Sequence, residues 1–347
     1  MAFFKLTSDI TIGKFRFSGV NEVHIKRSLH SIVDTAVIKI PSVARVVTNG
    51  KAAPESIITG KQFNDGDPVI IRLGYNGDLQ TEFCGFVTRR NLNMPLEIEC
   101  EGYSWLLRRN TIQTFSRSIK VKELLNIAVS GFENNYKITV QCDVDLDLIN
   151  VRIDNKSGFD IINDISKYTD GCLFCFFIQP KILWCGKIYT PYANGNDVLD
   201  MGKVNYKLGY NVFKDNSLRK RLSANDPVQV KYSKKLSNGD KISQTSSVFK
   251  NFVRTHSKIL NHLKDTVALK QLADEKAYQL NYSGYEGSIT AFLQPYAIPG
   301  NKVFITDDRY KERDGTYIIE GIEVDFGING ARRKVEIGPK VGFANEQ

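Results

Sequence analysis

The sequence is poor in the residues on which most metal and acid–base chemistry depends. Only four of its 347 residues are histidines, and no His-Glu-x-x-His pair occurs. Metal sites need several donor side chains that converge on one point, which isolated histidines do not supply. We therefore expect the histidines to be structural or exposed rather than ligands: His24, His30, His256 and His262.

Patterns that bind phosphate or activate a nucleophile are also missing. No Gly-Lys pair is followed by Ser or Thr, so the sequence contains no phosphate-binding loop. Neither a Gly-x-Ser-x-Gly elbow nor a Gly-x-Gly-x-x-Gly turn occurs. Nothing among the 38 acidic residues singles out a catalytic pair. The sequence therefore predicts no catalytic site, no cofactor and no metal centre.

One run of carboxylates resembles the start of a calcium loop. Asp143, Asp145 and Asp147 alternate with other residues, as the first ligands of such a loop do. The motif also needs Gly at its sixth position and Glu at its twelfth, where this chain has Leu148 and Asp154. We expect the three carboxylates to lie on a solvated face.

Cysteine is scarce and unpatterned. The six cysteines lie in strand-like apolar runs, where a free thiol behaves as a small hydrophobe, and they fit a reducing compartment. Cys172 and Cys175 have the spacing of a metal or redox motif, but residues three apart on a strand point to opposite faces. We expect their sulfurs to diverge into the core. The six are Cys84, Cys100, Cys142, Cys172, Cys175 and Cys185.

Long apolar runs and a strong charge excess are absent as well. No apolar run approaches the ~20 residues that a membrane span needs. Residues 1–7 lack the pattern of a signal peptide, so we expect a protein kept in a cytoplasm unless an assembly carries it out. The net charge of +9 permits an anionic partner without requiring one. The densest basic group reads as a solvated loop or strand edge: Arg219, Lys220, Arg221, Lys231, Lys234 and Lys235.

Alternation of apolar and polar residues dominates residues 1–110. Period-two runs predict half-buried strands, and Asn76-Gly77 between two apolar-rich runs predicts a hairpin. Sequential antiparallel strands with short turns favour a barrel or sandwich. The predicted strands cover 15–17, 22–27, 35–40, 69–73, 82–87 and 96–100.

Residues 111–200 change character and predict a small α+β insert. Ser118 is expected to cap a helix from Ile119 to about Val129. Ser157 leads a second helix that ends at Gly171. A buried strand over 172–178 and a return strand over 182–185 follow.

Residues 201–347 return to β structure and contain one predicted helix. Apolar residues at helical spacing place that helix over about 257–280, and Asn281 and Gly284 end it. A strand over 290–293 and a turn over 325–330 are predicted after it.

Part of the chain occurs twice, and this is its most informative feature. Glycines stand at 66, 85 and 102 in one copy and at 300, 321 and 338 in the other. Self-similarity of this kind reports architecture. We expect Val69–Ile71 to be equivalent to Val303–Ile305 and Gly85 to Gly321. The fold class expected is mainly β: two similar tube-like β-barrel modules, 1–110 and 201–347, flanking the small α/β domain 111–200.

The order of these motifs resembles the baseplate hub family of phage tails, including late control protein D, and the N-terminal part of VgrG-like type VI secretion spike proteins. The matching segments lie in order along almost the whole chain: 63–71, 83–87, 98–107, 287–290, 298–303, 315–319 and 332–338.

The resemblance implies a homotrimer whose six barrels form a pseudo-six-fold ring between a hexameric tail tube and a trimeric spike. It implies a virion tail or baseplate protein, assembled in the bacterial host cytoplasm, with DNA or an effector passing through the lumen. The chain ends at Gln347 without an OB domain or β-helix, so a separate spike protein is implied. Two other readings stay open, namely a phage-associated cell-wall hydrolase and a β-rich carbohydrate-binding or adhesion module.

Two polar loops at matching places in the repeat are the expected contacts with the tube or the spike. The first spans 74–79, and the second, longer and more basic, spans 307–314. A difference between the copies is what turns six-fold into three-fold symmetry. The predicted partner-contact residues are Tyr75, Asn76, Asp78, Arg309, Lys311 and Arg313.

Overall fold

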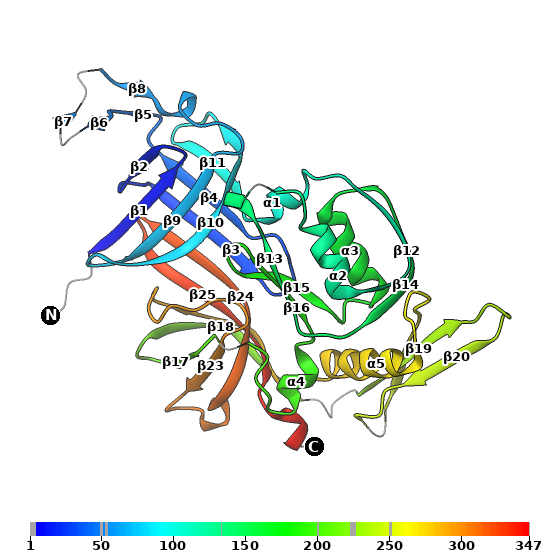
Figure 1. The fold of residues 1–347 in the computed structure, drawn as a ribbon. Helices are drawn as coiled ribbons and strands as arrows, with labels where there is room; N and C mark the ends of the chain where they lie inside the picture. The colour runs from blue at the N-terminus through cyan, green and yellow to red at the C-terminus, as the bar shows by residue number, and fades with distance from the viewer. Residues whose placement is uncertain are drawn as a thin grey trace.

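The computed structural model describes residues 5–48, 51–52, 55–132, 134–199, 201–222, 227–249 and 252–346 (Figure 1). The chain builds two β modules and a mixed α/β part beside them. The prediction of a mainly β fold is confirmed. No helix within the described ranges is both long and apolar enough to cross a bilayer.

The first module is an antiparallel sheet in the strand order β2-β1-β9-β10-β11-β4-β3. Side chains alternate between core and surface in β4 and β11, as the sequence pattern predicts. The hairpin predicted at Asn76-Gly77 joins β9 to β10, and both turn residues have positive φ. The strands are β1 (Leu6–Ile12), β2 (Phe15–Phe17), β3 (Glu22–Ser28), β4 (Thr35–Ile40), β9 (Pro68–Tyr75), β10 (Asp78–Asn91) and β11 (Leu96–Glu101).

A narrow arm leaves this module between β4 and β9 (Figure 1). In it β5 pairs with β8 and β6 with β7, each antiparallel. A 3-10 turn then leads back to the module. The elements are β5 (Val43–Ala44), β6 (Val47–Thr48), β7 (Lys51–Ala52), β8 (Ile57–Ile58) and η1 (Thr59–Lys61).

The second module has the strand order β18-β22-β25-β24-β23-β17. All its pairings are antiparallel except that of β17 with β23. The turn predicted over 325–330 is shorter, because β24 continues to Gly327. The elements are β17 (Lys203–Lys207), β18 (Val212–Arg221), β22 (Gly284–Ala291), β23 (Lys302–Thr306), η3 (Lys311–Arg313), β24 (Gly315–Gly327), β25 (Gly330–Lys340) and η4 (Phe343–Glu346).

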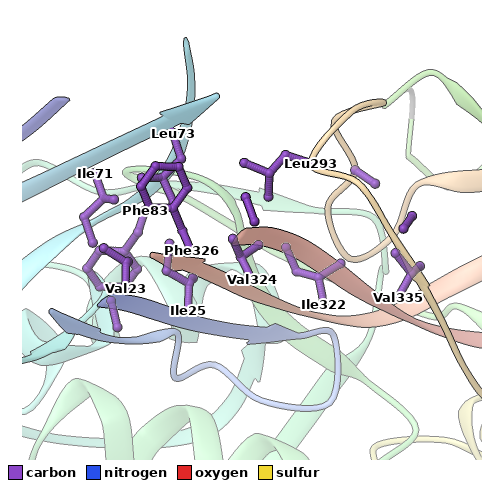
Figure 2. Packing of buried hydrophobic residues seen from close by; sticks show 14 of the residues in the cluster. Val23, Ile25, Ile71, Leu73, Phe83, Leu293, Ile322, Val324, Phe326 and Val335 are labelled. Atoms are coloured by element: carbon purple, nitrogen blue, oxygen red, sulfur yellow. The ribbon is translucent and has the colours of Figure 1, made fainter. Parts of the chain in front are cut away.

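The two modules are parts of one 13-stranded sheet. The second half of β24 pairs with β3, from Gly321 opposite Ser28 to Gly327 opposite Glu22. A single hydrophobic cluster fills both modules, and Figure 2 shows side chains of β3 and β24 lining it together. Because the core is continuous, the two modules form one structural unit rather than two independent domains.

The repeat is present, but the predicted equivalence of Gly85 and Gly321 is wrong. Gly66 and Gly300 have φ of +91° and +88°, and each donates a 2.8 Å backbone hydrogen bond to the second strand that follows it, β10 or β24. The acceptors are Val87 and Ile319. Val87 and Ile319 therefore occupy equivalent positions in the two modules. Two residues further on, Gly321 is equivalent to Arg89 of the first module and not to Gly85.

Different close approaches explain the two glycines. A Cβ atom on Gly85 would lie 2.2 Å from the carbonyl oxygen of Glu101, whereas one on Gly321 would lie 2.4 Å from the side chain of Glu336. The hairpin β9–β10 runs further than β23–β24 and contains a bulge near Phe83. Equal glycine spacing in the sequence therefore does not correspond to equal positions in the sheets.

The insert packs helices against small sheets. The predicted cap at Ser118 is wrong, because β12 continues to Lys120 and the helix begins only at Val121. Ser157 does cap its helix, with reciprocal hydrogen bonds to Asp160. The elements are α1 (Ser104–Leu107), β12 (Ile112–Lys120), α2 (Val121–Ala128), η2 (Asn134–Tyr136), β13 (Thr139–Cys142), β14 (Asp147–Lys156), α3 (Gly158–Tyr168), β15 (Phe174–Gln179), β16 (Ile182–Gly186) and α4 (Tyr189–Ala193).

The helix predicted over 257–280 begins nine residues later than expected. Its first part is the strand β21, and Asp265 caps the helix by accepting a 2.7 Å hydrogen bond from the backbone of Ala268. Leu260 and Leu263 are buried, but outside the helix. The elements are β19 (Val228–Lys235), β20 (Lys241–Thr245), β21 (Arg254–Ile259) and α5 (Thr266–Leu280).

The hydrophobic clusters do not follow the predicted boundary at residue 200. Val230, Tyr232 and the buried face of α5 share one cluster with α2 and α3. We infer that residues 227–280 belong to the insert, although they follow the first strands of the second module in sequence. Figure 1 shows α5, β19 and β20 on the side of the insert.

Candidate assembly surfaces

The structure gives each histidine its own intramolecular partner and gathers none of them at one place. His24 pairs with Asp325 at 2.6 Å, and His256 pairs with Asp170 at 2.8 Å. His30 lies 3.4 Å from Glu320, and His262 stacks on Tyr168. Within the described residues, no group of three or more His, Cys, Asp or Glu side chains is arranged to hold a metal ion.

The carboxylates that resemble a calcium loop are held apart by separate contacts. Asp143 accepts a 2.6 Å hydrogen bond from the indole of Trp184. Asp145 pairs with Lys120 at 2.7 Å, and Asp147 pairs with Lys264 at 2.8 Å. Asp143 and Asp145 lie in the connection between β13 and β14 rather than on a strand. Each carboxylate therefore serves local structure.

A polar cluster of the insert surrounds Asp170. Its carboxylate accepts 2.8 Å contacts from Tyr232 and His256 and also pairs with Lys258. Burial by itself raises the pKa of Asp170, but the hydrogen bonds from Lys258, His256 and Tyr232 outweigh it and hold the pKa below its usual value. The cluster ties the end of α3 to β19 and β21.

A thiol lies beside that cluster without being activated by it. Cys172 is fully buried, and its sulfur lies 3.5 Å from the hydroxyl of Tyr232. Burial raises the pKa of Cys172 to about 12, so the thiol stays protonated at neutral pH. Its sulfur and that of Cys175 face different neighbours, as predicted, but not for the predicted reason, because β15 begins at Phe174 and Cys172 precedes the strand.

The first predicted contact loop is exposed at its tip and contacts the second module through Tyr75 and Asp78. Tyr75 is buried, and its hydroxyl contacts Leu293 and Ala331 at 3.3 Å. Asp78 is exposed but accepts a 2.7 Å hydrogen bond from Gln294. Asn76 is exposed and caps the backbone of Lys5 at 2.9 Å. Of the three predicted residues, Tyr75 has no surface to offer a partner.

The three basic residues of the second predicted loop differ in exposure: one is largely buried and two are on the surface. Arg313 is largely buried and pairs with Asp215 at 3.0 Å and Asp307 at 3.1 Å, so it holds the loop in place. Arg309 is exposed, and Lys311 is exposed beside Asp308. Arg309 and Lys311 therefore remain as surface cations, whereas Arg313 is structural.

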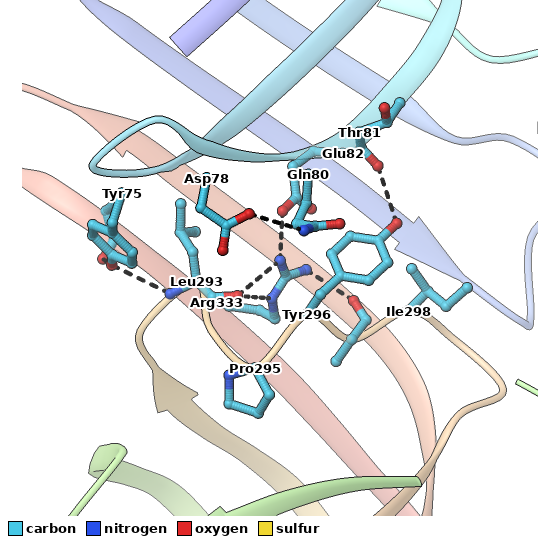
Figure 3. Close-up of polar contacts among 12 residues, drawn as sticks. Tyr75, Asp78, Gln80, Thr81, Glu82, Leu293, Pro295, Tyr296, Ile298 and Arg333 are labelled. Carbon is cyan, nitrogen blue, oxygen red and sulfur yellow. Dashed lines mark hydrogen bonds and ion pairs between the residues drawn. The ribbon is translucent and has the colours of Figure 1, made fainter. Parts of the chain in front are cut away.

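A buried ion pair between the modules is the site that the sequence analysis missed. Arg333 of β25 is fully buried and donates to the Glu82 carboxylate at 2.6 Å. Its other N–H groups donate to the carbonyl oxygens of Leu293 and Ala297 (Figure 3). Alternation along β25 was a usable signal, because it places Arg333 on the same inward face as Val335.

Hydrogen bonds around the ion pair fasten the two modules further. Tyr296 donates to the carbonyl oxygen of Thr81 at 3.0 Å (Figure 3). Burial alone lowers the pKa of Arg333, but the charge and hydrogen bond of Glu82, together with Tyr206 and Tyr296, outweigh it, and the pKa ends above its usual value. The guanidinium thus stays charged inside the joint, which we define as Glu82, Arg333, Tyr75 and Tyr296.

Exposed apolar side chains gather where the arm leaves the first module. Val43 and Ile58 are cross-strand neighbours in the arm. Leu92 lies against Gly60 at the base of the arm, so closely that a Cβ atom on Gly60 would touch it. A groove of about 1100 Å³ runs between the arm and the strands β1 and β2. Exposed apolar groups that cluster in this way are typical of an interaction surface. More than half of each side chain is exposed in Val43, Val47, Ile58, Leu92 and Met94.

Solved structures with the same fold come from phage tails and from a secretion system. A tail protein of Neisseria meningitidis matches with a TM-score of 0.66 and 11% identity, over 98% of this chain and 99% of that one. The 43 kDa tail protein of prophage MuSo2 from Shewanella oneidensis matches with a TM-score of 0.63 and 15% identity, over 98% and 99%.

An Escherichia coli component of the type VI secretion system also matches. It is described as structurally similar to the T4 bacteriophage tail proteins gp27 and gp5, and its TM-score is 0.55 with 8% identity, over 95% of this chain and 76% of that one. No family model matches the sequence, and no curated protein does. The fold of this chain is therefore that of these tail proteins, and at 8–15% identity the likeness shows the fold alone.

Proposed function

We propose that the protein is a structural hub of a phage tail or phage-like contractile injection system. Three copies would form a pseudo-six-fold ring that joins a tail tube protein to a separate spike protein, and DNA or an effector would pass through its lumen. The observation that carries this proposal is one continuous sheet holding two equivalent modules per chain, in a fold shared end to end with tail proteins. With two modules in each chain, a closed ring of six modules contains three chains.

The joint supports a mechanical role. A buried ion pair, with further hydrogen bonds to the loop between β22 and β23, fixes the angle between the modules, since charges in a low-dielectric interior hold a defined geometry. Six modules close a ring only if that angle is the same in every copy. The location that follows is a virion tail or baseplate, with assembly in the host cytoplasm.

The arm is the surface that we propose for contact between copies. Its exposed apolar side chains would lose contact with water in a ring, which stabilises association by roughly 25 cal/mol for each Å² buried. The groove at its base is lined by Phe17, Val46 and Phe63 and offers an apolar seat for a neighbouring arm.

The mass of the particle in solution tests the proposed ring. We expect the purified protein to have about three times the 39.2 kDa mass of one chain in light scattering at high concentration. Replacing both Leu92 and Met94 with Asp should lower that mass toward one chain, because charges would enter an apolar contact. The same replacement at the separate, exposed Ile328 is the matched control and should leave the trimer intact. A stable dimer or tetramer would rule out the ring.

Charge reversal in the second loop tests attachment to a tube or spike. In the variant with Arg309→Glu and Lys311→Glu, we expect a normal trimer that sediments less with assembled tails. Attachment of the unchanged protein should fall with added salt, and that of the variant should fall less, because screened charge pairs cause the difference. Reversing Lys235 and Lys241, an exposed cross-strand pair in the insert, changes the net charge equally and is the control. Equal tail binding by both variants would remove this loop from the contact surface.

A further inference from the structure

Three cysteines from three neighbouring strands lie side by side across the small sheet of the insert. Cys142 of β13 is in register with Cys185 of β16, and Cys175 of β15 is in register with the same Cys185. Register partners on neighbouring strands project to the same face of a sheet. The sulfurs of Cys175 and Cys185 are 3.2 Å apart, and Cys185 also hydrogen-bonds to Cys142. We call this row the thiol ladder.

The members of the ladder differ in access to solvent. Cys185 is fully buried, whereas Cys142 and Cys175 are only partly buried. An outer thiol can therefore meet a small molecule, and the central thiol is protected but within reach of both outer ones. The remaining cysteines have no such neighbour among the described residues: Cys84, Cys100 and Cys172.

The hydrogen bond between Cys142 and Cys185 shifts the pKa values of the two thiols in opposite directions. The hydrogen bond from Cys185 lowers the pKa of Cys142 to about 7, and burial opposes this only in part. The same hydrogen bond raises the pKa of Cys185, with burial adding to the effect. Near neutral pH, Cys142 is thus the member that carries a thiolate, which is the reactive form of cysteine.

We propose that the thiol ladder is a disulfide-exchange site, whose co-reactant is a small aliphatic disulfide such as oxidised glutathione. The Cys142 thiolate attacks one sulfur of that disulfide, forms a mixed disulfide and releases one thiolate. That thiolate takes the proton of Cys185, and the Cys185 sulfur attacks the sulfur of Cys142 and releases the second small thiolate, which is protonated from water. Two protein thiols are oxidised to one disulfide, and the small disulfide is reduced to two thiols.

Sheet geometry makes the internal step feasible. Disulfides join residues whose Cα atoms are about 4.4–6.8 Å apart, and opposed residues on neighbouring strands fall in that range. Cys175 can next attack Cys185 and move the bond from one strand pair to the other. Because both bonds use Cys185, a chain holds one disulfide at a time and keeps one free thiol. The site is independent of ring formation, since it lies within the insert.

Peptide mapping after oxidation tests the proposal. The full chain is incubated with oxidised glutathione, its free thiols are alkylated, and digested peptides are identified by mass spectrometry. We expect one internal disulfide per chain, always containing Cys185, with Cys142 or Cys175 as its partner. Glutathione capture at Cys142 should be half-maximal near pH 7 and at least about fivefold faster at that pH than capture at the partly buried Cys84, whose pKa is raised by burial.

Two variants separate the steps. Cys185→Ser should leave glutathione on Cys142 with no internal disulfide, and Cys172→Ser, the control, should behave as the unchanged chain. If Cys185→Ser does not fold by circular dichroism, the variant with Cys142→Ser and Cys175→Ser replaces it and should form no disulfide. Internal disulfides without Cys185, or equal capture at Cys84 and Cys142, would overturn the proposal.

Discussion

Replacing Arg333 with Met is expected to lower the free energy of unfolding by about 3–5 kcal/mol, because it leaves the buried Glu82 carboxylate without its partner. The arginine also satisfies the carbonyl oxygens of Leu293 and Ala297, which the methionine cannot do. Urea unfolding followed by tryptophan fluorescence, to which the buried Trp184 contributes, measures the change.

The matched variants show whether the charge itself is responsible. Adding Glu82→Leu to Arg333→Met should recover part of the loss, since it removes the unpaired buried carboxylate, whereas the carbonyl oxygens of Leu293 and Ala297 stay without their donor. Arg16→Met removes an ion pair with Asp9 whose arginine is mostly exposed, and should change stability little. A loss of equal size in Arg16→Met and Arg333→Met would show that burial of the joint does not govern its strength.

Replacing Glu275 with Ala is expected to cost at least about 3 kcal/mol, because three backbone N–H groups, two of them buried, would lose their acceptor. The Glu275 carboxylate of α5 is fully buried and accepts hydrogen bonds of 2.7–3.0 Å from these groups, which open α4. The donors are Ile188, Tyr189 and Thr190. Thermal unfolding by circular dichroism should show a clearly lower midpoint.

Two further substitutions on the same helix isolate the role of that carboxylate. Glu275→Gln keeps the shape but turns one acceptor into a donor, so its cost should lie between those of the unchanged protein and the alanine variant. Gln271→Ala lies one turn earlier on the exposed face of α5 and should be near neutral. If Glu275→Ala lowered stability no more than Gln271→Ala does, the hydrogen bonds between α5 and α4 would not contribute to stability.

The link places α5 at a junction of the molecule. Tyr189, whose backbone binds Glu275, also donates through its hydroxyl to Glu320 of β24 at 2.7 Å. The insert is thereby connected to the second module through α4. Sequence position alone assigns α5 to the second module, and its packing assigns it to the insert.

Local patterns were reliable wherever the physical cause is local. Period-two alternation predicted β3 and β4, because a strand with one buried face alternates its side chains whatever it pairs with. Asn76-Gly77 predicted a hairpin, because both residues adopt positive φ easily. Ser157 predicted a cap, because its hydroxyl reaches the backbone three residues on.

Predictions failed where a distant partner overrides a local preference. Leu260 and Leu263 have helical spacing, yet β21 pairs with β19 and the helix starts only after Asp265. Arg313 looks like a surface cation in the sequence, but carboxylates from β18 and its own loop surround it. Spacing between glycines did not reveal that bulges and hairpin lengths differ between the two modules.

The sequence by itself determined the β-rich class, the presence of two related modules and several turns and caps, because these depend on residues close along the chain. Only the tertiary structure decided that β3 and β24 join the modules into one sheet, that Arg333 meets Glu82 inside it, and that three scattered cysteines form one row. Most of these contacts join residues separated by dozens to hundreds of positions; Cys175 and Cys185 are 10 apart. Such pairings are selected by the burial of whole faces, which no short pattern encodes.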